Sequence, residues 1–170
     1  MKYLIDFIAL ALIYAFVLYK KWKQKGRDIL LVRTLFYVYL SLVALVTLMP
    51  VITSLPFILN HPYDFMNMVP FIDALSGRGD FIRQILLNVI MTVPFGFLYP
   101  MTHSPHAGFL KTVLFCFLMS LGIELLQPFF DRSSDITDLI TNVIGGALGY
   151  GLYAVFKPVA FWVLDRLKNG

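Results

Sequence analysis

Long apolar stretches, separated by short charged or Pro- and Gly-containing segments, make up most of the chain. An α-helix that crosses a membrane needs about 20 mostly apolar residues. The stretches of suitable length are residues 3–19, 29–52, 81–99, 109–130 and 136–156. The segments between them are too short for a separate soluble domain. The pattern therefore predicts an all-α, polytopic membrane protein with about five transmembrane helices, in which residues 1–170 form a single domain.

The composition supports this prediction. Hydrophobic residues make up 59% of the chain and charged residues 14%, and the mean hydropathy is +0.77, which lies well outside the usual balance of a soluble domain. In a soluble protein the net charge of +4 would suggest nucleic acid as a partner. Here the basic residues lie beside the apolar stretches, where they set membrane topology. We therefore expect membrane lipids as partners and no nucleic acid.

The basic residues also predict the orientation of the chain. The densest basic segment, residues 20–27, follows the first apolar stretch, and basic residues gather again near residue 168. Because basic loops tend to stay in the cytoplasm, we expect the N-terminus to lie outside. Lys157 and Pro158 should end the fifth helix, and residues 161–168 should form an amphipathic interfacial tail on the cytoplasmic side.

The segment between the second and third helices, residues 53–80, is not a typical polar linker. It contains apolar pieces at residues 55–59 and 67–72, which are too short to cross a membrane. We expect this loop to be extracytoplasmic, with its apolar pieces either lying in the outer interface or re-entering between the helices.

Polar and charged residues interrupt the third, fourth and fifth apolar stretches. A charge at the bilayer centre costs about 3 kcal/mol, so such a residue predicts a functional site. Glu124 is the deepest charge, roughly 9 Å from the outer end of its helix at 1.5 Å per residue, and Asn67 lies in a loop that could cover the site. With the predicted topology the following residues fall at or near the outer half of the membrane: Asn88, Glu124, Gln127, Arg132, Asp135, Asp138 and Asn142.

Structural roles would also explain most of these residues. Asp135 suits the N-cap of the fifth helix and Asp138 its third position, since carboxylates are favourable at a helix N-terminus. Arg132 could pair with Asp131 or Asp135. Asn88, Gln127 and Asn142 could form hydrogen bonds between helices. Glu124 has no cation within one turn, and we expect it to be protonated, paired with Arg132, or bound to a ligand.

Three further features carry weaker signals. Gly145 and Gly149 form a G-x-x-x-G pair that lets another helix approach closely. That helix could belong to the same chain or to a second copy, so a homo-oligomer is one outcome. Cys116 is the only cysteine, which excludes an intrachain disulfide. His103 and His106 are interpreted as a solvated loop, because no Cys, Asp or Glu lies near them in sequence to complete a metal site.

Several motifs together resemble those of the VanZ-like family of bacterial membrane proteins. They are the run Asn88 to Pro100, then Glu124-Leu-Leu-Gln127, Arg132, Asp135-Ile-Thr-Asp138, Asn142-Val-Ile-Gly145, and Asn67-Met-Val-Pro70-Phe71 ahead of the third helix. The resemblance covers residues 67–150. It implies a multi-pass protein of the bacterial cytoplasmic membrane, associated with resistance to teicoplanin and related lipoglycopeptide antibiotics. It implies no settled reaction and no cofactor.

The residues, together with what the resemblance implies, leave two main functions open. In the first, an outer-leaflet polar pocket binds or masks a lipid-linked envelope component or the antibiotic. Arg132 and the amide end of the fifth helix would then hold an anion, while Glu124 and the asparagines would bind sugar or peptide groups. In the second, the protein is an enzyme that modifies a lipid-linked cell-wall precursor, with Glu124 and Asp138 as its catalytic acid and base.

The enzymatic alternative has a metal-dependent form. Glu124, Asp135 and Asp138 offer the hard oxygen ligands that Mg²⁺ or Ca²⁺ prefers, although we assign no metal site. Helix assembly is a third role for the polar residues, and transport is a weaker fourth, because the chain shows no internal repeat.

Overall fold

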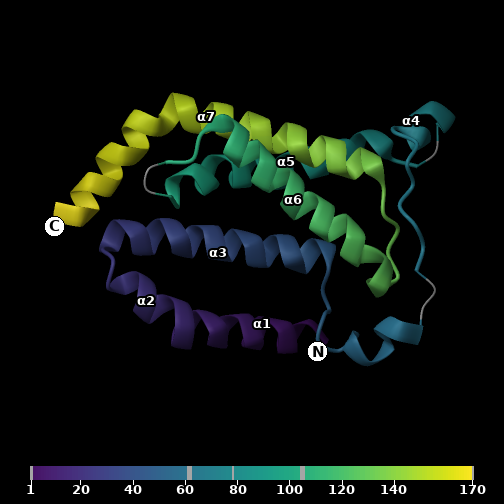
Figure 1. The fold of residues 1–170 in the computed structure, drawn as a ribbon, viewed down its shortest axis with the longest axis horizontal. Coiled ribbons are helices and arrows are strands. Elements are labelled where there is room, and N and C mark those ends of the chain that lie inside the picture. The colour runs from purple at the N-terminus through teal and green to yellow at the C-terminus, as the bar shows by residue number, and fades with distance from the viewer. Residues whose placement is uncertain (1, 61–62, 78, 104–105, 170) are drawn as a thin grey trace.

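The computed structural model describes residues 2–60, 63–77, 79–103 and 106–169. Within these residues every element of regular secondary structure is a helix (Figure 1). Those long and apolar enough to cross a membrane cover Lys2–Lys23, Arg27–Thr47, Phe81–Met101, Phe109–Phe130 and Ile136–Lys168. The predicted all-α class with five membrane-spanning helices is therefore confirmed.

The first two spans form a hairpin. The first consists of α1 (Lys2–Ile13), a π-helical turn η1 (Tyr14–Leu18) and α2 (Tyr19–Lys23), and the second is α3 (Arg27–Thr47). Gly26 makes the turn between them with a φ of +123°, a conformation that glycine adopts without a steric penalty. Across the hairpin the Tyr37 hydroxyl donates to the carbonyl of Leu10 at 2.8 Å. A tyrosine side chain of α3 thus binds the backbone of α1.

The helix α3 ends at Thr47 and not at residue 52, where the apolar stretch ends. Pro50 has no amide to donate and disfavours helical backbone at the residue before it. Beyond it, the buried carboxylate of Asp6 in α1 accepts hydrogen bonds from the backbone amides of Val51 and Ile52, each at 2.9 Å. These amides bind a side chain from another helix in place of carbonyls of α3. The hydropathy pattern shows where the apolar residues end. It does not show that these two amides bind the side chain of Asp6.

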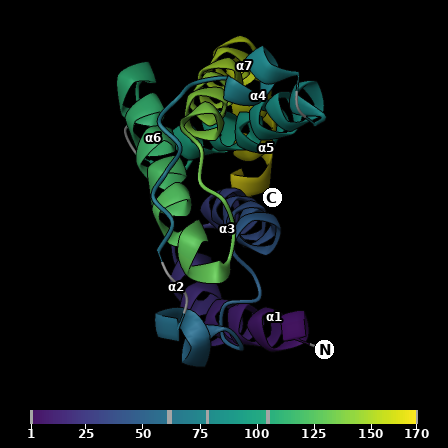
Figure 2. The same ribbon diagram turned by 90° about the vertical axis from the view of Figure 1, so that its right-hand side faces the viewer.

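The other three spans pack together as a second unit. They are α5 (Phe81–Met101), α6 (Phe109–Leu126), which continues as a 3-10 turn η3 (Gln127–Phe130), and α7 (Ile136–Asn169). Figure 2 shows α5 and α7 side by side, with α3 between this pair and α1. The most extensive helix contact is between α5 and α7.

Glycines permit this close contact. A Cβ at Gly149 would meet the carbonyl of Val93 and lie 3.0 Å from the Cα of Gly96, and one at Gly145 would meet Thr92 and the carbonyl of Val89. Both glycines of the G-x-x-x-G pair therefore face α5 of the same chain. The predicted homo-oligomer stays a prediction, and it would have to use another surface.

The last helix is longer than its apolar stretch. We expected Lys157 and Pro158 to end it, but α7 continues through Pro158 to Asn169. Figure 1 shows that α7 changes direction in its C-terminal part, as expected for a helix that contains proline, since this residue removes one backbone hydrogen bond. The predicted amphipathic tail, residues 161–168, is thus an extension of the same helix.

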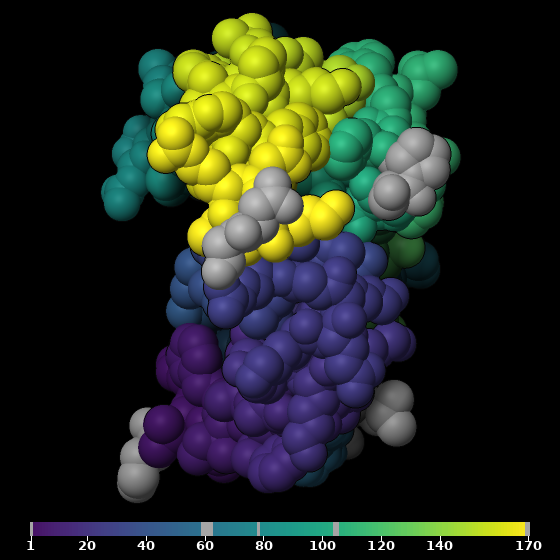
Figure 3. All heavy atoms as spheres, turned by 90° about the vertical axis from the view of Figure 1, so that its left-hand side faces the viewer, coloured from purple at the N-terminus to yellow at the C-terminus, as the bar shows by residue number. Residues whose placement is uncertain are grey.

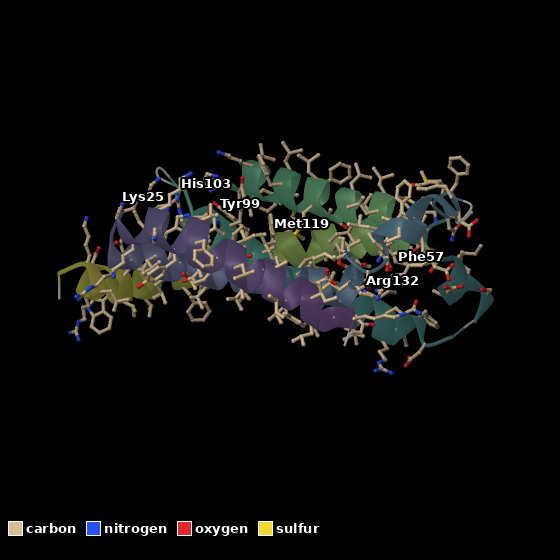
Figure 4. All side chains as sticks on the ribbon, turned by 90° about the horizontal axis from the view of Figure 1, so that it is seen from below. Lys25, Phe57, Tyr99, His103, Met119 and Arg132 are labelled. Atoms are coloured by element: carbon tan, nitrogen blue, oxygen red, sulfur yellow. The ribbon has the colours of Figure 1, made fainter. Side chains whose placement is uncertain are left out.

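The bundle has two chemically different ends. Figure 4 places Lys25 and His103 at one end and Phe57 and Arg132 at the other. The loop between α3 and α5 lies at the second end and contains a 3-10 helix η2 (Leu55–Asn60) and α4 (Ile72–Ser76). Its apolar side chains Phe65, Met68 and Leu75 are 89%, 67% and 81% exposed. Which end faces outside, and whether this loop is interfacial or re-entrant, stay predictions.

Candidate functional site

Asn67 joins the loop before α4 to the start of α7. Its amide donates to the carbonyl of Ser134 at 2.9 Å, and its own carbonyl accepts from the amide of Ile136 at 3.0 Å. Its side-chain Nδ2 donates to Oδ2 of Asp135 at 2.8 Å. Asn67 therefore lies against the start of α7, where the contact is a short, strand-like bridge. Its predicted part in binding a ligand stays a prediction.

Asp135 caps α7. Its Oδ1 accepts a hydrogen bond from the amide of Thr137 at 2.6 Å, which is the bond an N-cap side chain makes to the second residue of a helix. The N-cap interpretation is confirmed. The two oxygens of Asp135 thus serve different partners, since one caps the helix and the other holds Asn67.

Glu124 lies behind this cap. Its side chain is 2% exposed, and its Oε2 accepts from the amide of Asp135 at 2.9 Å and from the hydroxyl of Ser134 at 3.0 Å. Of the three predicted states of Glu124, pairing with Arg132 is not found, because Arg132 donates to Val46. Whether Glu124 is protonated or binds a ligand stays a prediction. The structure shows it supporting the segment that begins α7. Sequence could not reveal this, because the partners belong to the turn after η3.

Arg132 binds elsewhere. Its Nη1 donates to the carbonyl of Val46 near the end of α3, at 2.6 Å. Arg132 thus has a protein partner, and the carboxylates of Asp135 and Glu124 accept from amides at the start of α7. Whether Arg132 and this helix start together hold an anion stays a prediction.

Two further contacts define the surroundings of the cap. Asn88 in α5 donates from Nδ2 to Oδ1 of Asp138 at 2.6 Å. The amide of Phe71 donates to the hydroxyl of Thr137 at 2.8 Å, and Phe71 has a φ of +56°, which is uncommon for a residue with a bulky side chain. A conformation of this kind often accompanies a functional site.

These contacts surround an open cavity of about 300 Å³, at the lower end of the range for ligand pockets. It lies between α4, the first turns of α5 and the start of α7. Three of its polar side chains are carboxylates, which only accept hydrogen bonds when ionised, whereas the amides and hydroxyls can also donate. Its apolar lining comes from Phe71, α4 and α5. The polar lining residues are Asn67, Asp73, Gln84, Ser133, Ser134, Asp135, Thr137 and Asp138.

A second cavity of about 270 Å³ lies on the other side of Asn67. Asn67, Ser133 and Ser134 line both cavities. Arg132 lines only this second one, where Asp64 and Asp131 are its charged neighbours.

A deeper polar layer lies between α5, α6 and α7. Asn142 donates from Nδ2 to the hydroxyl of Ser120 at 2.9 Å, and its carbonyl accepts from the hydroxyl of Thr92 at 2.7 Å. Within the described residues Oδ1 of Asn142 and Oε1 of Gln127 are buried without a partner. The predicted interhelical role is confirmed for Asn88 and Asn142, whereas the Gln127 side-chain oxygen makes no such bond.

The structure divides the predicted site residues into groups. Asn67, Asp135 and Asp138 line the 300 Å³ cavity, whereas Glu124 does not, so Glu124 and Asp138 are not set on two sides of one ligand there. Whether they act as acid and base stays a prediction. The described residues include no group of three or more His, Cys, Asp or Glu side chains placed to hold a metal ion, and the suggestion of Mg²⁺ or Ca²⁺ stays untested.

Sequence reasoning missed several residues of the site. Asp73 and Gln84 line the cavity, and Thr92 and Ser120 bind Asn142. A signal was present for Gln84, Thr92 and Ser120, because each lies four residues from a predicted site residue, Asn88 or Glu124, and hence on the same helix face. No comparable signal marks Asp73, which reaches the cavity through the fold of the loop.

Comparison with known proteins identifies the family. The VanZ/LLP1 family matches residues 7–157, a range that contains every polar residue of the candidate site. The chain belongs to the VanZ/LLP1 family. It is also similar to Protein VanZ of Enterococcus faecium, with 36% identity over 99 residues. This match covers 58% of the chain and 58% of the relative, so the chain spans less than two thirds of that protein. No solved structure matches.

The family assignment extends beyond the predicted core of residues 67–150, because it includes most of the α1–α3 hairpin. In this VanZ-like protein the family match therefore includes both the α1–α3 hairpin and the packed helices α5, α6 and α7. Its five candidate spans also make it a multi-pass membrane protein.

Proposed function

We propose that this VanZ-like protein protects bacteria against teicoplanin and related lipoglycopeptides by binding a lipid-linked envelope component in the 300 Å³ cavity. The observation that carries the proposal is the lining of that cavity, in which Asp73, Asp135 and Asp138 lie together beside Gln84. Carboxylates accept hydrogen bonds strongly from charged or hydroxyl donors. The bound group would therefore carry hydroxyl or ammonium groups, as sugars and peptides do.

The membrane setting supports a ligand that is anchored in lipid. Phe65, Met68 and Leu75 are exposed on the loop that supplies Asn67 and Asp73 to the cavity. Apolar side chains next to a polar cavity suit a molecule with an acyl chain and a polar head. We further propose that the protein resides in the cytoplasmic membrane with its N-terminus outside, so that the cavity opens at the outer leaflet.

Binding is favoured over catalysis by the positions of the carboxylates. Glu124 is buried and accepts two hydrogen bonds from the segment before α7, and Asp135 caps that helix. Both are thus engaged in positioning the chain. Asp138 lines the cavity and has a side-chain partner in Asn88, which fixes its orientation toward a ligand.

The test compares neighbouring residues at the start of α5. Arg83 and Gln84 are both exposed, but only Gln84 lines the cavity. Cells that carry Gln84→Trp, which fills the cavity, should lose protection against teicoplanin, and Asp138→Asn should lower it. Cells that carry Arg83→Trp should keep it at equal membrane levels of protein. Full protection with Gln84→Trp would contradict the proposal.

The orientation needs its own experiment. Leu75 is 81% exposed, whereas the natural Cys116 is fully buried and should react little. In whole cells a membrane-impermeant maleimide should label Leu75→Cys and should leave Lys25→Cys, at the opposite end (Figure 4), unlabelled until the cells are opened. The reverse pattern would place the cavity on the cytoplasmic side and end the proposal in this form.

A further inference from the structure

The opposite end of the bundle has two adjoining cavities that the proposed function does not use. Figure 3 looks onto this end, where the yellow C-terminal part of α7 lies against the indigo α3. The larger cavity measures about 570 Å³ and the smaller about 310 Å³. Both are lined by Arg33, Thr102 and His103, so these residues mark the junction between them.

The larger cavity is an open apolar groove between the first span and α3. Beyond the junction it is lined by Leu18, Trp22, Phe36, Tyr37 and Leu40. From Arg33 to Leu40 it follows α3 over seven residues, which is roughly 10 Å at 1.5 Å per residue. The groove therefore runs from the charged end of the bundle toward the bilayer centre, in the direction of a lipid acyl chain.

The wall of this groove is ordered by aromatic contacts. Tyr37 stacks on Tyr14 with ring centroids 5.6 Å apart and meets Trp22 at 6.3 Å. The π-helical turn η1 ends at Leu18, which lines the groove. Such turns are rare and frequently accompany functional sites, and here the turn adjoins the cavity wall.

The junction offers donors for a phosphate. The Arg33 guanidinium donates a long hydrogen bond from Nη2 to the carbonyl of Thr102 at 3.4 Å. The His103 Nδ1 lies 2.9 Å from the Thr102 hydroxyl and 3.2 Å from the carbonyl of Tyr99, so its Nε2 can donate to a phosphate when the imidazole carries both protons. A guanidinium binds phosphate through two parallel hydrogen bonds.

The smaller cavity offers carboxylates on the far side of this junction. Asp28 at the start of α3 and Asp165 near the end of α7 both line it, together with the basic His106 and Lys168. An ammonium group is a suitable ligand for the two carboxylates. Along the two cavities, an apolar groove is followed by the cationic junction and then by a region that contains both carboxylates and basic side chains.

We propose that this end binds a phospholipid with an ethanolamine-type head. An acyl chain lies in the apolar groove, the phosphate lies between Arg33 and His103, and the ammonium lies near Asp28 and Asp165. This site is separate from the polar cavity at the other end of the bundle. It would hold a lipid of the leaflet that contains the basic loop, and would join the α1–α3 hairpin to α5 and α7.

The experiment measures lipid binding to the purified full-length chain in detergent. Phosphatidylethanolamine, phosphatidylcholine and phosphatidylglycerol with identical acyl chains are titrated separately and bound lipid is counted by native mass spectrometry. We expect phosphatidylethanolamine to bind most tightly, because the choline ammonium has no N–H donor and glycerol has no cation. Equal or tighter binding of phosphatidylglycerol would overturn the proposal.

Three variants and one control locate the site. Arg33→Gln should weaken phosphatidylethanolamine binding about tenfold, in line with the loss of a charge-assisted hydrogen bond. Asp28→Asn should remove the preference over phosphatidylcholine. Leu40→Trp should weaken binding of all three lipids by filling the groove. Arg83→Gln, which removes an exposed arginine at the opposite end, should change nothing.

Folding is checked by the thermal unfolding midpoint of each variant without added lipid. If Arg33→Gln is unstable, Leu40→Trp decides the question, because it leaves the charges in place. Unchanged lipid binding by a folded Leu40→Trp would overturn the proposal, since it would show that lipid binds elsewhere on the apolar surface.

Discussion

The carboxylate of Glu124, near the end of α6, accepts a hydrogen bond from the backbone amide of Asp135, the residue that caps α7, at 2.9 Å. The hydroxyl of Ser134 donates to the same oxygen at 3.0 Å. Asp135 in turn binds Asn67. One buried side chain therefore links α6, the start of α7 and the loop that forms the cavity.

Replacing Glu124 should affect stability according to the acceptor that remains. Glu124→Gln keeps a carbonyl oxygen for Asp135 and Ser134 and should cost little. Glu124→Leu leaves the Asp135 amide unpaired and should lower the free energy of unfolding by about 2 kcal/mol. Thermal unfolding in detergent, followed by fluorescence, measures both. A Glu124→Leu protein as stable as wild type would show that the bond contributes nothing.

The bond between Asn88 and Asp138 should show energetic coupling. Its length of 2.6 Å and its carboxylate acceptor indicate a charge-assisted bond. Hydrogen bonds between membrane helices contribute about 0.6 kcal/mol on average and up to about 1.7 kcal/mol. We expect a coupling of about 1.5 kcal/mol from a double-mutant cycle with alanine at both positions. The pair Asn88 and Asp73 is the control and should give a value near zero.

Gly149 and Gly151 should respond differently to alanine. A Cβ at Gly149 would meet the backbone of Val93, whereas nothing lies within 4 Å of one at Gly151. Gly149→Ala should separate α5 from α7 and destabilise by about 1–3 kcal/mol. Gly151→Ala should be neutral or stabilise by up to about 1 kcal/mol, because alanine favours helix. Equal effects at the two positions would mean that α5 does not pack on this face.

Asp6 should control protection of the segment after α3. Asp6→Leu removes the acceptor of the Val51 and Ile52 amides, so both should exchange hydrogen with solvent faster. Asp6→Asn keeps one carbonyl oxygen and should preserve part of the protection. Hydrogen exchange resolved by mass spectrometry over residues 48–54 is the measurement. Asp28→Asn, at the other end of the bundle, should leave these amides unchanged.

The pattern of apolar and polar residues along the sequence determined the class of fold and which helices carry the buried polar residues. Apolar length is a local property, so it identified five spans and placed their starts close to those found, as for Phe81, Phe109 and Ile136. The N-cap role of Asp135 was also predictable, since caps depend on a few adjacent residues. The ends of the helices were less predictable from the sequence. The helix α3 ends at Thr47, ahead of the amides that Asp6 binds, and α7 continues beyond Pro158.

Only the tertiary structure decided which polar residues share a cavity. Asn67 and Asp135 are 68 positions apart, and no local pattern relates two such residues. The sequence left the partners of Glu124 open, and they are Ser134 and the amide of Asp135, in a turn whose path the sequence does not specify. Asp73 lines the cavity because the loop folds back over α7. Local periodicity determines which residues form helices, whereas side-chain partners depend on how those helices pack.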